Sequence, residues 1–99
     1  RVSQPRKIAM RLLDESSYIE NIVGKWSPIN GQEYPIEFSK YGTAIQKRSY
    51  DNRVEYSLNG SSLKIRYDNA RVAISEDASY YYLEIYNSED FSGRYRKSK

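Results

Sequence analysis

Near its start, the chain spaces apolar residues as an α-helix does. Pro5 suits a first helical turn, where its missing N–H costs nothing. Three apolar residues then fall on one helical face: Ile8, Leu12 and Leu13. The spacing predicts a helix over about residues 5–16. Because it has so few apolar residues, this helix is expected to pack on the rest of the molecule or to plug one end of it.

Two serines follow the predicted helix. The pair Ser16–Ser17 either ends it or caps a second short helical turn through Ile19 and Ile22. The sequence leaves both alternatives open.

From Gly24 onward the apolar period changes from 3.6 residues to 2, which is the period of a β-strand. The alternation predicts a strand through Lys25–Trp26 and further strands over 34–39, 43–49, 53–58, 63–67, 72–75, 80–86 and 91–97. Turn-forming residues separate them, at Tyr41–Gly42, Asp51–Asn52, Asn59–Gly60, Asp68–Asn69, Glu76–Asp77 and 87–90. Asn-Gly between two alternating runs is the strongest of these hairpin signals.

These elements predict a mainly β fold. Connections of about two to four residues are too short for parallel crossovers, so neighbouring strands are expected to be antiparallel. A run of about eight hairpin-linked strands is an up-and-down meander, which removes its free edges by closing into a barrel. We therefore predict a single domain over residues 1–99, with an N-terminal helix at about 5–16 and a small β-barrel over about 22–97.

Composition and charge add one argument about partners. Of the 99 residues, 38% are hydrophobic and 29% are charged, and no apolar run is long enough to span a bilayer. The net charge of +3 is concentrated at the C-terminus, because the residues before Arg94 carry 12 basic and 13 acidic side chains. A nucleic-acid-binding protein usually spreads a basic patch over its folded surface, so a nucleic-acid partner is disfavoured.

The residue types needed for catalysis and metal binding are scarce. Cysteine and histidine are both absent, so the chain lacks a thiol nucleophile and the commonest general base and metal ligand. The acidic pairs Glu76–Asp77 and Glu89–Asp90 fall in solvated turns, where adjacent carboxylates point apart and stay ionised. No phosphate-binding loop or nucleophile-elbow motif occurs. The sequence therefore predicts a protein that is not an enzyme, with no cofactor and no metal site.

Tyrosine is the unusual feature of the composition, with 11 copies against two Phe and one Trp. Alternation places one set of rings inside the barrel, as candidate ligand contacts: Trp26, Phe38, Tyr56, Tyr67, Tyr81 and Tyr95. A second set shares the outer face of one strand, as candidate surface interaction residues: Tyr80, Tyr82 and Tyr86. For the outer row we favour packing against Lys or Arg stems of neighbouring strands. Six bulky inward rings favour a filled interior over a sizeable ligand cavity.

Four short segments occur in a characteristic order along the chain. They are Gly24–Lys25–Trp26, the strand and turn over 36–43, the hairpin over 54–63 and the closing strand over 93–97. Together they resemble the lipocalins and the short lipocalin-like (calycin-type) domains of bacterial surface lipoproteins. The second segment departs from the family pattern, because Tyr41 stands where an Asp usually precedes the turn glycine. The resemblance covers about 22–97.

The resemblance implies structural roles and an environment. Gly24 and Trp26 would anchor the barrel, and Arg94 or Arg96 would stack over the Trp26 ring as a cation–π contact. It also implies a small apolar ligand and export to the periplasm or cell surface of a bacterium. Because the chain begins with Arg1 rather than Met, a signal peptide or a lipid-anchoring cysteine upstream is left open.

We expect a non-catalytic binding or interaction module for a small apolar ligand, a sugar or a protein partner. Two alternatives stay open: a single-stranded nucleic-acid-binding barrel of the OB type, and a protein inhibitor of an enzyme. An OB barrel has five longer strands and typically a helix in the middle, whereas here the helix comes first.

Overall fold

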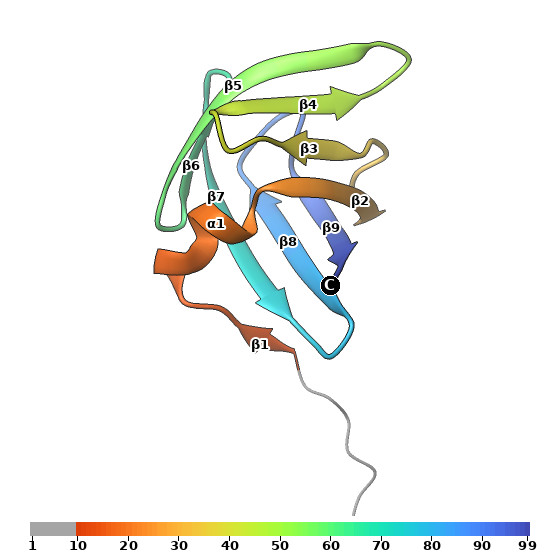
Figure 1. Cartoon of the computed structure of the whole chain (residues 1–99). Helices are drawn as coiled ribbons and strands as arrows, with labels where there is room; N and C mark the ends of the chain where they lie inside the picture. The colour runs from red at the N-terminus through yellow and green to blue at the C-terminus, as the bar shows by residue number, and fades with distance from the viewer. Residues whose placement is uncertain (1–9) are drawn as a thin grey trace, which may run out of the picture.

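The computed structural model describes residues 10–99 and shows a mainly β protein (Figure 1). A short strand β1 (Arg11–Leu12), a 3₁₀ turn (Glu15–Ser17) and the helix α1 (Tyr18–Asn21) come first. Eight strands follow: β2 (Gly24–Asn30), β3 (Ile36–Phe38), β4 (Thr43–Lys47), β5 (Asp51–Asn59), β6 (Ser62–Ile65), β7 (Asp68–Glu76), β8 (Tyr80–Tyr86) and β9 (Gly93–Ser98). The predicted order, a short helix and then about eight strands, is confirmed.

Strands β2 to β9 form an antiparallel meander that closes into a barrel. Each strand pairs with the next along the chain, and β9 pairs back with β2 at Ser27↔Arg96 and Pro28↔Tyr95. A β-bulge between Pro28 and Asn30 interrupts this closing ladder, where proline cannot donate a hydrogen bond. Every strand of the meander therefore has a partner on both sides, as the sequence predicted.

Two nine-residue strands, β5 and β7, change partners along their length. The first half of β5 pairs with β4 and the second half with β6, while β7 pairs first with β6 and then with β8. Because β6 is short, it leaves one side of the end of β7 uncovered. Strand β1 fills this place, with Arg11 and Leu12 opposite Glu76 and Ser75.

The helix predicted over 5–16 does not form over residues 10–14. Residues 5–9 lie outside the described residues, and Arg11–Leu12 form a strand. The uncovered end of β7 explains the difference, because it offers backbone hydrogen-bond partners that a helix with few apolar residues cannot match. The Leu13 N–H continues the pairing by donating to the Ile74 carbonyl over 2.9 Å.

The second helical turn is the one that forms, as α1. Ser17 stands at its N-cap without a side-chain cap bond, and Tyr18 and Ile22 are buried in the core. Because α1 packs between β5 and β7, it covers one end of the barrel (Figure 1). Neither this helix nor another in residues 10–99 has the length and apolar character needed to cross a membrane.

Most predicted turns lie where the sequence places them. The hairpin predicted at Asn59–Gly60 forms, but its turn lies one residue later: Asn59 ends β5 and pairs with Ser62, and Gly60, with a φ of 59°, and Ser61 make the two-residue connection. The turn predicted at Asp51–Asn52 is wrong, since both residues begin β5 and the chain bends over 48–50 instead.

Tyr67 shows the largest displacement from its predicted place. The turn predicted at Asp68–Asn69 lies two residues earlier, because Ile65 pairs directly with Asp68 and leaves Arg66 and Tyr67 between them. Arg66 adopts a φ of 56°, which the tight turn demands. Tyr67 therefore leaves the inward face of β6 and is 90% exposed, so its predicted position inside the barrel is wrong.

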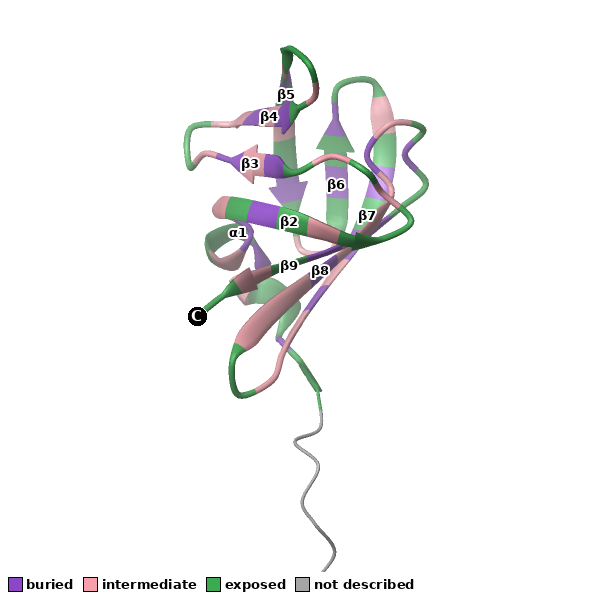
Figure 2. Cartoon of the chain, turned by 90° about the vertical axis from the view of Figure 1, so that its right-hand side faces the viewer, coloured by how far each residue is buried: buried purple, intermediate pink, exposed green. Residues whose placement is uncertain are grey.

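The core runs along the inside of the barrel. Buried and exposed residues alternate along the strands, as the purple and green bands of Figure 2 show. The largest fully buried side chains come from β2, α1, β9, β3 and the turn before β9: Trp26, Tyr18, Tyr95, Phe38 and Phe91. Burying a large apolar side chain contributes about 1.5–3 kcal/mol, so these rings hold the walls together.

Candidate binding site

Trp26 links the barrel wall to the helix. Its side chain is 1% exposed, and its indole Nε1 donates a 2.8 Å hydrogen bond to the carbonyl of Ile22, just after α1. The bond satisfies the one polar atom of the buried ring. These contacts give Trp26 a structural role.

A cation lies over the Trp26 ring, but it is Lys97. Its Nζ is 4.6 Å from the ring, whereas Arg94 and Arg96 lie over tyrosines of the outer face. The prediction that Arg94 or Arg96 stacks on Trp26 is therefore wrong. Strand alternation explains the result: Tyr95 points inward, so its neighbours point outward and Lys97, two positions later, points inward again.

Lys97 also fastens α1 to β9. Its Nζ donates 2.7 Å hydrogen bonds to the carbonyls of Asn21 and Val23. Burial lowers the pKa of this ammonium group. A Cβ on Gly24 would lie 3.2 Å from the same Nζ, and its φ of +133° is one that other residues rarely adopt. The glycine of the opening segment thus leaves room for the lysine.

The structure separates the six rings predicted to point inward. Trp26, Phe38 and Tyr95 are fully buried, Tyr56 and Tyr81 are half-buried at the margin of the core, and Tyr67 is outside. The Tyr56 ring meets the Phe38 ring edge-on, with centroids 4.9 Å apart, and its hydroxyl donates to the carbonyl of Ser39. Burial raises the pKa of the Tyr56 hydroxyl.

The end of the barrel opposite α1 is covered by the turn before β9. Phe91 of this turn is fully buried, and its carbonyl accepts a 2.6 Å hydrogen bond from the Tyr95 hydroxyl. The buried Gln46 donates to the Asp90 carbonyl over 2.9 Å, and the Asp90 carboxylate pairs with Arg66. Both ends of the barrel are therefore covered by parts of the chain itself.

The outer tyrosines pack against arginines, as we favoured from the sequence. The Arg96 guanidinium lies 4.2 Å from the Tyr80 ring, and the Arg94 guanidinium lies 5.5 Å from the Tyr82 ring. Tyr86, at the end of the row, is the most accessible of the three at 47% exposed.

Tyr82 also takes part in a titratable cluster. The Ser79 N–H, the Tyr82 hydroxyl and the Tyr80 N–H all donate to the Asp77 carboxylate, which holds the pKa of Asp77 below its usual range. A depressed folded-state pKa contributes stability that is present above the unfolded-state pKa and is lost as the pH falls through the folded-state value. We therefore expect a carbon-13 NMR titration of the Asp77 carboxyl to have a midpoint below 3.8. Tyr82→Phe should move the midpoint upward, and a wild-type midpoint at or above 3.8 would contradict the cluster.

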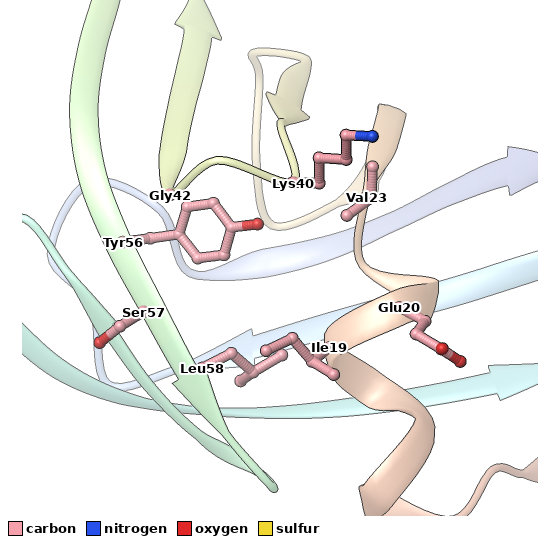
Figure 3. Close-up of a pocket in the computed structure, with 8 residues that line it drawn as sticks. All are labelled: Ile19, Glu20, Val23, Lys40, Gly42, Tyr56, Ser57 and Leu58. Carbon is pink, nitrogen blue, oxygen red and sulfur yellow. The ribbon is translucent and has the colours of Figure 1, made fainter.

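An open groove runs along the outside of α1, where the helix meets β5 and the turn before β4. We call it the α1–β5 groove, and its volume is about 480 Å³. Figure 3 shows its lining, which consists of Ile19, Glu20, Val23, Lys40, Gly42, Tyr56, Ser57 and Leu58. This volume lies within the usual range of about 300–1,000 Å³ for small-molecule sites.

The α1–β5 groove combines an apolar floor with charged rims. Ile19 lies beside Leu58 across the groove and stays 54% exposed, which is unusual for a large aliphatic side chain (Figure 3). The Lys40 ammonium and the Glu20 carboxylate stand at different rims. Within the described residues Lys40 makes no ion pair and only approaches the Tyr41 ring, at 5.3 Å. The arrangement suits a small amphiphile.

Sequence reasoning found only one wall of this groove. It singled out Tyr56, but not Lys40 or the exposed Ile19. The alternative helical turn paired Ile19 with Ile22, but residues three apart share a helical face, so nothing in the sequence indicated that Ile22 is buried while Ile19 is 54% exposed. Over residues 10–99, no group of three or more acidic, His or Cys side chains is placed to hold a metal ion.

Comparisons with protein-family models, with curated proteins and with solved structures found no match to this chain.

Proposed function

We propose that this protein is a non-catalytic, lipocalin-like binding module that takes a small apolar molecule with an anionic head in the α1–β5 groove. One observation carries the proposal: the exposed Ile19 and its apolar neighbours form a groove of ligand size beside the unpaired cation of Lys40, among the described residues. An apolar chain laid on the floor would remove this surface from water.

The lipocalin-like assignment rests on two further features. The Gly24–Lys25–Trp26 opening follows a short helical segment, and a basic side chain, Lys97, stacks over the tryptophan. The ligand would nevertheless lie beside the helix rather than inside the barrel, because aromatic side chains occupy the interior.

We extend the same proposal to location. The resemblance to domains of bacterial surface lipoproteins supports export to the periplasm or the cell surface. The OB-type alternative loses its structural basis, because the eight consecutive strands differ from the five-stranded OB barrel.

Octanoate is a suitable probe, with a short apolar chain and one carboxylate. Ile19→Gln should weaken octanoate binding about fivefold, because covering an exposed aliphatic side chain contributes about 1 kcal/mol. Lys40→Gln should weaken it about twofold to fivefold, as expected for an exposed charge pair. Calorimetric titration gives both affinities, and 1-octanol should bind to the wild type about as weakly as octanoate binds to Lys40→Gln.

Matched controls come from residues outside the lining of the α1–β5 groove. Ile29→Gln removes an isoleucine of similar exposure, 41%, and Lys47→Gln removes an exposed lysine of β4. Both should leave octanoate binding unchanged. If Ile19→Gln binds octanoate as the wild type does, the groove is not the ligand site.

A further inference from the structure

A second site, which shares only Ser57 with the α1–β5 groove, lies on the outer face of β5, β6 and β7. These strands run side by side at the left of Figure 1. Their pairing sets out two rows of exposed side chains. One row is Ser57–Lys64–Asn69, and the other is Asn59–Ser62–Arg71.

The two rows line a depression of about 440 Å³, which we call the polar recess. Its lining also includes Asn87, which follows β8 with a φ of 67°. No residue of the lining is acidic. The lining consists of three asparagines, two serines, Lys64 and Arg71, beside the buried Leu63 and Ala70.

The two cations of the recess are placed to act together. Lys64 lies opposite Asn69, and Arg71 lies opposite Ser62, so the two are diagonal neighbours on adjacent strands. Such neighbours are about 7–8 Å apart at the backbone, within the reach of long side chains. Arg71 donates to the Ser61 hydroxyl over 3.1 Å, and within the described residues neither cation makes an ion pair. An oxyanion between them would receive charge-assisted hydrogen bonds.

The asparagine amides around the two cations indicate a ligand that carries hydroxyl groups as well as an anionic group. Asn59, Asn69 and Asn87 each offer two donors and an acceptor, a set that matches neighbouring hydroxyl groups. The half-exposed Tyr86 stands opposite Arg71 on β8 and directly precedes Asn87 of the lining. An aromatic ring gives a hydroxylated ligand an apolar surface to cover.

We propose that the polar recess binds a phosphorylated sugar, with the phosphate between Lys64 and Arg71 and the hydroxyls on the asparagine amides. A flat membrane surface fits less well, because the recess is concave and the two apolar residues of its lining, Leu63 and Ala70, are buried.

Nitrogen-15 NMR titration with glucose 6-phosphate tests this site directly. The side-chain amide signals of Asn59, Asn69 and Asn87 should shift. Lys64→Gln and Arg71→Gln should each weaken binding about fivefold, in line with the loss of one charge-assisted contact at a solvated site. Inorganic phosphate should bind more weakly than glucose 6-phosphate, because it makes none of the hydroxyl contacts.

Two exposed cations elsewhere serve as controls, Lys25 on β2 and Arg53 at the start of β5. Lys25→Gln and Arg53→Gln should leave the affinity for glucose 6-phosphate unchanged. Equal weakening in all four variants would overturn the proposal in favour of diffuse charge attraction. Signals that shift with phosphatidylglycerol vesicles but not with glucose 6-phosphate would overturn it in favour of a lipid surface. Equal affinities for inorganic phosphate and glucose 6-phosphate would also overturn it.

Discussion

Replacing Trp26 with alanine is expected to lower the free energy of unfolding by about 3–5 kcal/mol, the usual cost of truncating a buried aromatic ring. The substitution empties the place that Trp26 fills beneath α1, and leaves the Ile22 carbonyl without its 2.8 Å indole donor. It also removes the ring under the Lys97 ammonium. A small domain has only about 5–15 kcal/mol of stability in total, so this loss is a large fraction of it. Urea denaturation followed by circular dichroism measures the change.

Tyr67→Ala is the matched control for this experiment. It removes an aromatic ring of similar size that is 90% exposed, and should change the free energy of unfolding by less than about 0.5 kcal/mol. A loss below about 1 kcal/mol in Trp26→Ala would contradict its place in the core.

Replacing Gly93 with alanine is expected to cost about 3 kcal/mol or more, because steric overlap and backbone strain act together. Gly93 begins β9 with a φ of +144°. A Cβ there would lie 2.5 Å from the Gln32 Cβ and 2.9 Å from the Gly31 carbonyl oxygen, so backbone must move. The clash falls beside the ladder in which β9 closes on β2, and thermal unfolding should report a lower midpoint.

Gly31→Ala separates the two causes. Gly31 also has a positive φ, +73°, but a Cβ there would meet only the Gly93 Cα at an ordinary 3.6 Å. It should therefore cost only the left-handed backbone strain, about 1–2 kcal/mol. Equal losses in the two variants would show that the steric overlap at Gly93 is absent.

The two proposed sites share the strand β5 but differ in chemistry. Ser57 borders both sites. The α1–β5 groove has an apolar floor that includes Ile19, whereas the polar recess is lined by basic side chains and asparagine amides. Ile19→Gln should therefore leave glucose 6-phosphate binding intact, and Arg71→Gln should leave octanoate binding intact. Each proposal can fail without the other.

Local alternation predicted the strands and their inner faces well. The alternation of apolar and polar residues placed four side chains on the inner face, and all four are buried: Val54 and Leu58 of β5, and Leu83 and Ile85 of β8. The period of a strand is a local property, so short-range sequence is enough to assign a face. The positions of turns were predicted less accurately, because they depend on the register between two strands. The turn expected at Asp68–Asn69 lies at Arg66–Tyr67 and carries Tyr67 out of the barrel.

The candidate sites were largely beyond local reasoning. The resemblance pointed to Arg94 or Arg96 as the cation over Trp26, so Lys97 was not considered. Lys97 lies two positions after the inward Tyr95, and strand alternation alone would have placed it on the inner face. The α1–β5 groove needs Ile19, Lys40 and Leu58 to meet, and these come from three separate segments. The polar recess depends on the register that sets Lys64 beside Asn69 and Ser62 beside Arg71.

The sequence by itself determined a mainly β chain whose consecutive hairpins form a meander with an aromatic interior, since apolar period and turn residues act over a few neighbours. The tertiary structure decided where the helix forms, because the uncovered end of β7 draws residues 11–12 into a strand. It also decided which cation covers Trp26 and which side chains share a groove. Those outcomes depend on contacts between segments distant along the chain, which local patterns do not encode.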